Sequence, residues 1–192
     1  PLLRQLGSKD PQEQRQAFEQ LMAMGDEAIP LLLKALETLP YESQMLAIKG
    51  LAQLKAREAV MYLTEMLRDA DEPPHIRATA AWALGEIGDE SAIPGLIEAL
   101  IDEDIVSPDV HWIHSDPIDI FSIAKPVKHY AAEALRKFGL GGLADAFLRV
   151  LKERDERAIE KLRQFEPQRN EIVQTLCLAL DFSPRIGSQA AW

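Results

Sequence analysis

Apolar residues recur at intervals of three and four over most of the chain, and the clearest run lies near its middle. The apolar members of this run are Ile76, Ala80, Ala83, Leu84 and Ile87. Their spacing places them on one face of a helix. Gly88-Asp89 interrupts the run, and a second apolar stripe follows in residues 93–100, with Pro94 in its first turn, where a missing backbone N–H costs little. Two short helices joined by so tight a turn pack antiparallel, so the pattern predicts a helical hairpin.

The same unit recurs along the chain. Equivalent leucines of its first helix are Leu21, Leu51, Leu84, Leu135 and Leu162. The steps between them are 30, 33, 51 and 27 residues, so the long third step predicts an insertion. We expect one domain with hairpins at about residues 10–39, 40–70, 72–103, 126–154 and 155–181, an insertion loop at 104–124 and a tail at 182–192. Asp10, followed three residues later by Glu13, predicts a capping box at the start of the first hairpin.

The central repeat carries a resemblance to a known family. Its sequence, RATAAWALGEIGDESAIPGLIEAL, fits the pattern R-x-x-A-x-x-A-L-G-x-I-G-D-x-x-A-I-P-x-L-I-x-A-L. This pattern is similar to the short HEAT-like repeat, in particular to the subtype named for phycobilisome (PBS) bilin lyases. The resemblance covers about residues 10–180 and implies an all-α fold, a right-handed α-solenoid of about five HEAT-like hairpins. It specifies the fold and not the activity, because similar repeats occur in bilin lyase subunits, phycobilisome degradation proteins, metallohydroxylases and plain scaffolds.

Charge and composition narrow the class of partner. The chain has 21 basic and 31 acidic residues and a net charge of −10, which opposes binding to nucleic acid or to an anionic membrane surface. The single cysteine, Cys177, excludes an internal disulfide. No apolar run is long enough to span a bilayer and no leader is apparent, so we expect a cytoplasmic protein. The chain begins at Pro1 without an initiator methionine, which indicates that residues upstream have been lost or cut away.

Stacked hairpins leave an inner layer of second helices that lines a concave groove, where such proteins bind their partners. The candidate binding residues at the solvent positions of these helices are Tyr62, Glu65, Glu98 and Asp102. They predict a groove with an acidic middle that binds another protein. The alternative is that these charges only solvate the helix faces. Arg77 occupies a repeat position that is frequently basic, where it either stays solvated or pairs with acids of an adjacent helix.

The insertion is the most irregular stretch, and long loops in a compact stack are usually functional. Its candidate contact residues are Trp112, Ile113, Ile120 and Phe121, which are large apolar anchors of the kind that dominate interfaces. The alternative is that they pack the loop onto its own stack.

A metal site in the insertion is a weaker hypothesis. His111 and His114, with Asp109 or Asp116, offer imidazole and carboxylate ligands suited to zinc or iron. However, two prolines lie nearby and no third ligand stands at a diagnostic spacing. The repeated His-Glu pairs of HEAT-like metallohydroxylases are also missing, because each of the four histidines is followed by another residue type. We therefore predict no bound metal and no cofactor.

No pattern of residues indicates catalysis. Cys177 has no histidine near it, and the glycines of GLGG at residues 139–142 fit a helix C-cap better than a phosphate-binding loop. The last apolar segment, IVQTLCLAL, must be covered either by the tail, through Phe182, Ile186 and Trp192, or by an interface such as a dimer. We predict a non-catalytic scaffold or adaptor. The resemblance implies an alternative, a bilin lyase-type subunit or chaperone that handles an open-chain tetrapyrrole and a phycobiliprotein.

Overall fold

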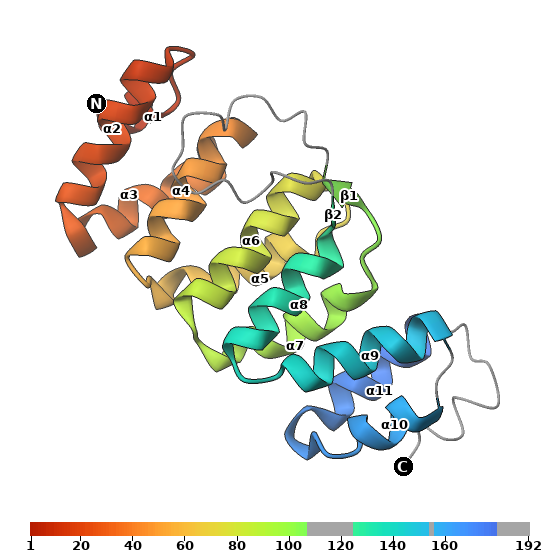
Figure 1. Cartoon of the computed structure of the whole chain (residues 1–192). Coiled ribbons are helices and arrows are strands. Elements are labelled where there is room, and N and C mark those ends of the chain that lie inside the picture. Colours follow the sequence, from red (N-terminus) through yellow and green to blue (C-terminus); the bar gives the residue numbers. More distant parts are fainter. Residues whose placement is uncertain (107–124, 154–155, 180–192) are drawn as a thin grey trace.

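The computed structural model describes residues 1–106, 125–153 and 156–179, and these residues form a stack of helices (Figure 1). The first helices of successive hairpins are α2 (Pro11–Ala23), α4 (Tyr41–Gln53), α6 (Pro74–Ile87), α8 (Val127–Lys137) and α10 (Glu156–Leu162). The second helices are α3 (Ile29–Thr38), α5 (Val60–Arg68), α7 (Ile93–Glu98), α9 (Gly141–Glu153) and α11 (Arg169–Ala179). A short helix, α1 (Leu2–Leu6), packs on α2. The predicted all-α solenoid of helical hairpins is confirmed.

Short 3₁₀ turns connect the two helices of four hairpins, a feature that the apolar spacing does not predict. They are η1 (Gly25–Ala28), η2 (Arg57–Ala59), η3 (Glu90–Ala92) and η6 (Glu166–Gln168). A further turn, η4 (Ala99–Ile101), extends α7. Prolines occupy the first turns of α2, α3, α6 and α7, where the absence of a donor is tolerated.

A residue in left-handed conformation ends the first part of four hairpins. These residues are Gly25, Lys55, Gly88 and Gly139, with φ values of 60°, 53°, 75° and 77°. Each stands four positions after the repeat leucine. Lys55 differs from the other three because it is not a glycine, but its backbone has the same left-handed conformation. The second hairpin therefore keeps the same turn geometry, although L-residues disfavour this conformation.

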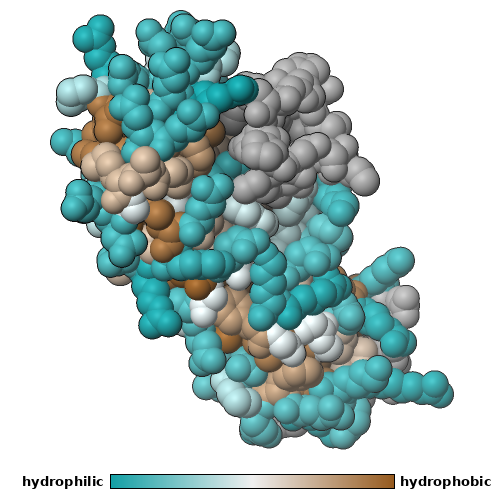
Figure 2. All heavy atoms as spheres, turned by 60° about the vertical axis from the view of Figure 1, so that its left-hand side comes forward, coloured by the Kyte–Doolittle hydropathy of each residue, from teal (hydrophilic) through white to brown (hydrophobic). Residues whose placement is uncertain are grey.

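The apolar faces meet between the two helix layers. The repeat leucines named above are all fully buried. α6 packs between α4 and α8, and Gly85 allows the closest approach, since a Cβ at this position would lie 2.8 Å from Cα of Ala134. The centre of the stack is therefore tightly packed. Figure 2 shows that one side of the molecule is hydrophilic over most of its area, with apolar atoms in two separate areas, over the N-terminal and the C-terminal helices.

The predicted capping box at Asp10 is only half right. One carboxylate oxygen of Asp10 accepts a hydrogen bond from the backbone N–H of Gln12 at 2.9 Å, as a cap should. Glu13 does not return the bond to Asp10. Its carboxylate instead accepts a hydrogen bond from the hydroxyl of Ser8 at 2.6 Å, and that hydroxyl accepts the N–H of Asp10 at 3.2 Å. The hydroxyl of Ser8 can both donate and accept, so it stands between the two groups.

The last two hairpins depart from the alternation of inner and outer helices that the repeat pattern predicts. α11 packs directly against α7, whereas α9 contacts η4 together with α8 and α10. Hydrophobic spacing reports which face of a helix is buried but not which neighbour covers it. The order of the C-terminal helices in the stack could therefore not be predicted from periodicity.

The insertion leaves and rejoins the stack through a narrow neck. β1 (Ile105–Val106) pairs antiparallel with β2 (Lys125–Pro126), and the N–H of Val127 donates to the carbonyl of Asp104 at 2.9 Å. Residues 104–106, predicted as loop, thus belong to the neck. The backbone pairing holds the two ends of the insertion side by side on the stack (Figure 1).

Candidate functional site

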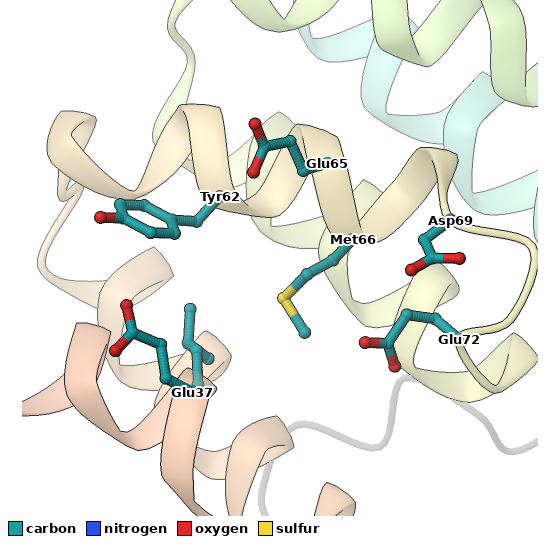
Figure 3. A pocket seen from close by; sticks show the side chains of 7 residues that line it. Glu37, Tyr62, Glu65, Met66, Asp69 and Glu72 are labelled. Atoms are coloured by element: carbon teal, nitrogen blue, oxygen red, sulfur yellow. The ribbon is translucent and has the colours of Figure 1, made fainter.

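An open hollow of about 220 Å³ lies between α3, α5 and the turn that follows α5 (Figure 3). Its lining residues, here called the acidic pocket, are Leu36, Glu37, Tyr62, Glu65, Met66, Asp69 and Glu72. In Figure 3, the side chain of Met66 points into the hollow, the ring of Tyr62 lies at one end, and the carboxylates of Asp69 and Glu72 lie near each other at the opposite end. Apolar atoms and carboxylates thus meet in one concave surface.

Helix geometry explains most of this lining. Tyr62, Glu65, Met66 and Asp69 follow one another at steps of three, one and three residues, so they project from the same side of α5 and its C-terminus. α5 ends at Asp69, which is extended, and the carboxylate of Asp69 accepts the N–H of Asp71 at 2.9 Å. The N–H of Glu72 then donates to the carbonyl of Asp69 at 3.1 Å. This turn carries Glu72 back to the same hollow.

The acidic pocket has no cation in its lining. Arg68, the nearest basic residue in sequence, forms a two-pronged pair with Glu98, at 2.6 and 2.8 Å. One carboxylate oxygen of Glu72, Oε2, is buried and accepts no hydrogen bond from the described residues. Burial raises the pKa of Glu72, the charge of Asp69 raises it further, and Arg77 partly opposes both effects. The pocket is therefore short of positive charge and of hydrogen-bond donors.

In the next repeat, the turn that begins at Asp102 is bound by an arginine of α6, Arg77. The guanidinium of Arg77 donates from Nε to Asp102 at 2.8 Å and from Nη2 to Asp104 at 2.6 Å, and Nη1 donates to the backbone carbonyl of Glu72. The side chain of Arg77 is only 4% exposed. Burial lowers the pKa of Arg77, but the hydrogen bonds that Arg77 donates to Asp102 and Asp104, together with the charges of these carboxylates, outweigh burial and raise it. Of the two alternatives left open for Arg77, the structure shows ion pairing.

The two turns begin alike at Asp69 and Asp102, which are 33 positions apart, the step between the repeat leucines. Asp69 and Asp102 are both extended residues that end a helix, and each accepts the N–H two residues later, at 2.9 and 3.0 Å. The counterpart of Arg77 is Gln44. Its amide nitrogen donates to the carbonyls of Leu36 and Leu39, both at 3.0 Å, much as Arg77 donates to the turn before α6.

The correspondence ends at the charge. Glutamine is shorter than arginine and carries no charge, and the structure gives Gln44 no bond to the carboxylate of Asp69. The amide oxygen of Gln44 is buried and has no hydrogen-bond partner among the described residues. Asp69, the counterpart of Asp102, lines the acidic pocket, whereas Gln44 is not among the lining residues.

The structure brings together only two of the residues predicted for the groove. Tyr62 and Glu65 line the acidic pocket, whereas Glu98 and Asp102 lie outside its lining and are held by Arg68 and Arg77. The residues that the sequence analysis did not assign to the site are Leu36, Met66, Asp69 and Glu72. Of these, Leu36 is buried and Met66 is half-buried. Asp69 and Glu72 belong to a turn, and the acidic run DADE at 69–72 is the signal that could have identified them.

The predicted contact residues of the insertion, Trp112, Ile113, Ile120 and Phe121, lie outside the described residues. The same holds for the metal candidates His111, His114 and Asp116. In residues 1–106, 125–153 and 156–179, no group of three or more His, Cys, Asp or Glu side chains is arranged to hold a metal ion. Among the helices described, none has the length and apolar character needed to cross a membrane.

Comparisons with known proteins agree with the fold. Residues 29–107 match the family of HEAT repeats, and residues 13–38 match the PBS lyase HEAT-like repeat. Both matches lie within residues 13–107, and they support a HEAT-like repeat protein of the PBS lyase subtype. Over 54 residues it is 46% identical to an uncharacterized protein in the gldA 3′ region of Geobacillus stearothermophilus, a match that covers 28% of this chain and 24% of that protein. The chain thus spans about a quarter of the length of this relative.

Proposed function

We propose that the protein is a non-catalytic scaffold or adaptor that binds a partner protein on its second-helix face, the surface formed by α3, α5 and α7. The observation that carries this proposal is the acidic pocket, where apolar side chains and carboxylates meet between α3, α5 and the turn after α5. A surface that is already formed binds without a large cost in ordering. The net charge of −10 favours a partner with a basic surface.

Charge reversal at the pocket tests this function. The variant Glu37→Lys/Glu65→Lys changes two acidic lining residues, and the control Glu19→Lys/Glu90→Lys makes the same change at exposed positions outside the pocket. In affinity capture with the full chain, we expect recovery of a specific protein to fall by at least about tenfold with the pocket variant and to stay unchanged with the control. Equal recovery with both variants would contradict the proposal.

The insertion supplies a second contact in this proposal, through Trp112, Ile113, Ile120 and Phe121. Large apolar residues are the usual anchors of an interface. Replacing residues 107–124 with a short Gly-Ser linker should weaken capture of the same partner while the neck keeps the stack intact. Undiminished capture would show that the insertion is not part of the interface.

The alternative function is a bilin lyase-type subunit or chaperone that handles an open-chain tetrapyrrole and a phycobiliprotein. The match of residues 13–38 to the PBS lyase HEAT-like repeat favours it. The acidic pocket, at about 220 Å³, is smaller than the roughly 300–1,000 Å³ of typical small-molecule sites, so it would hold only part of such a pigment. Mixing the protein with a bilin should sharpen and shift the absorption band to the red if this function holds, and an unchanged spectrum would exclude it.

A dimer through the C-terminal helix is a further part of the proposal. Leu178 on α11 is 71% exposed, and an apolar side chain in this position gains from being covered by a second copy. Leu178→Glu should convert a dimer to a monomer in sedimentation velocity. A wild-type chain that is monomeric at all concentrations would remove this part.

A further inference from the structure

We propose that the acidic pocket receives one arginine or lysine side chain of the partner protein, with its alkyl stem on Met66 and Tyr62 and its charged head beside Asp69 and Glu72. The inference rests on the proposed function, because it requires a partner on the second-helix face. It adds the chemistry by which that partner is recognised.

The protein itself provides the first argument. In the third hairpin, Arg77 joins the turn at 70–72 to the carboxylates of Asp102 and Asp104. In the second hairpin, the equivalent place has the carboxylate of Asp69 but no cation, because Gln44 stands at the position of Arg77. The counterpart of Asp102, Asp69, is therefore exposed, and no cation among the described residues pairs with it. A guanidinium or ammonium group from another chain fits it by the same chemistry.

An unpaired oxygen of the lining provides the second argument. Oε2 of Glu72, a lining residue, is buried without a hydrogen-bond donor among the described residues. A buried acceptor without a partner is unfavourable, so a ligand that brings N–H donors is preferred over one that brings only acceptors or only apolar atoms. Arginine and lysine side chains have several donors and no acceptor.

The lining and the size provide the third argument. Leu36 is almost buried, and Met66 and Tyr62 are half-buried, so the hollow has an apolar part beside its carboxylates. Arginine and lysine lay their methylene stems along apolar surface while the charged head contacts polar groups, and a cation is also attracted to the face of a tyrosine ring. A hollow of about 220 Å³ is suited to one long side chain rather than to a whole folded element.

Methionine methyl groups report on this binding directly. The protein is labelled with ¹³C at the methionine ε-methyls and titrated with the peptide acetyl-Gly-Ser-Arg-Ser-Gly-amide or with its norleucine counterpart, which keeps the stem and lacks the charge. Met66 lies in the pocket, whereas Met61 on the same helix is 63% exposed and outside the lining. We expect a saturable shift of the Met66 signal with the arginine peptide and none at Met61. The Met66 signal is assigned with Met66→Leu.

Two variants separate the pocket from the general acidity of the chain. Asp69→Asn/Glu72→Gln should weaken binding of the arginine peptide by about tenfold, because each lost charged contact costs a few-fold in affinity. Glu19→Gln/Glu90→Gln removes the same charge from exposed sites outside the pocket and should change the affinity less than about twofold. Gln44→Arg should abolish the response of Met66, because the chain's own guanidinium then reaches the same carboxylates.

The outcomes that overturn the inference differ from those that overturn the proposed function. If Met66 responds equally to the norleucine peptide, or if both double variants lose the same affinity for the arginine peptide, the pocket does not bind a cation. Neither result contradicts the proposed scaffold function. The absence of any response at Met66, while the partner is still captured on the second-helix face, rejects the bound cation in the same way. The proposed function fails by a separate result, namely that Glu37→Lys/Glu65→Lys leaves the recovery of the partner protein unchanged.

Discussion

The turns after α5 and after η4 begin with the same extended aspartate but differ in the charge that faces it. In the later turn, Asp102 and Asp104 are paired with the buried guanidinium of Arg77. In the earlier turn, no cation of the described residues pairs with Asp69, and the amide nitrogen of Gln44 donates to the backbone carbonyls of Leu36 and Leu39. One difference of residue type therefore separates a site that stabilises the fold from a site that is left available for binding. Identical carboxylates do not have identical roles in the two repeats.

The largest expected effect comes from making the third repeat like the second. Arg77→Gln removes a buried cation and leaves Asp102, whose side chain is 18% exposed, without its partner. We expect the free energy of unfolding to fall by about 3 kcal/mol, at the low end for breaking a buried pair because Asp104 is 66% exposed and can be hydrated. Urea unfolding followed by circular dichroism measures it. Arg68→Gln, which breaks an exposed pair, should cost less than about 1 kcal/mol, and equal losses would refute the distinction.

A smaller effect is expected when only one carboxylate of the paired turn is changed. Asp102→Asn keeps the shape and an acceptor oxygen but removes the charge opposite Nε of Arg77, so we expect a loss of about 1–2 kcal/mol in unfolding free energy. Asp104→Asn should cost less, because that side chain is largely hydrated. A double-mutant cycle with Arg77→Gln should show coupling to Asp102. Strict additivity would mean that the pair does not contribute.

The reverse exchange makes the second repeat like the third. Gln44→Arg should place a guanidinium between Leu39 and Asp69 and remove the unpaired amide oxygen, so we expect a gain of about 1 kcal/mol in unfolding free energy. Gln53→Arg adds the same charge at an exposed position of the same helix and should change stability by less than about 0.5 kcal/mol. A destabilised Gln44→Arg protein would show that the turns are less alike than their backbones indicate.

The smallest effect concerns pH. Burial raises the pKa of Glu72 above its ordinary value of 4.5, so the folded state holds a proton that the unfolded state has lost. The unfolding free energy therefore falls as pH rises from 4.5 through the raised pKa. Glu72→Gln should remove this fall and leave the protein slightly more stable near neutral pH, whereas Glu58→Gln, at an exposed position, should leave the pH profile unchanged. The opposite slope would contradict the assignment.

Much of the fold could be predicted from the sequence because the repeat leucines fix which helix faces are buried. The glycines at 25, 88 and 139 also indicate the left-handed turns. The residue type of Lys55 does not indicate its left-handed conformation, and only the spacing from Leu51 does. The packing of α11 on α7 depends on contacts between distant segments, which periodicity does not encode.

The candidate site was predictable only in part. Tyr62 and Glu65 could be placed on the exposed side of a helix from spacing alone. Asp69 and Glu72 could not, because they reach the pocket through the geometry of a turn. The sequence also does not show that Glu98 is ion-paired while Glu65 lines the pocket. This difference arises because Arg68 reaches across the hairpin boundary to Glu98.

The neck formed by β1 and β2 has a consequence for engineering. Because backbone hydrogen bonds fasten residues 105–106 to residues 125–126, the helices on either side do not depend on how much chain runs between them. The entropy of closing a loop grows only with the logarithm of its length, so each doubling costs about 0.6 kcal/mol. The segment between β1 and β2 is therefore suited to peptide grafting. A foreign epitope that replaces it would be displayed at a fixed point of the helical stack.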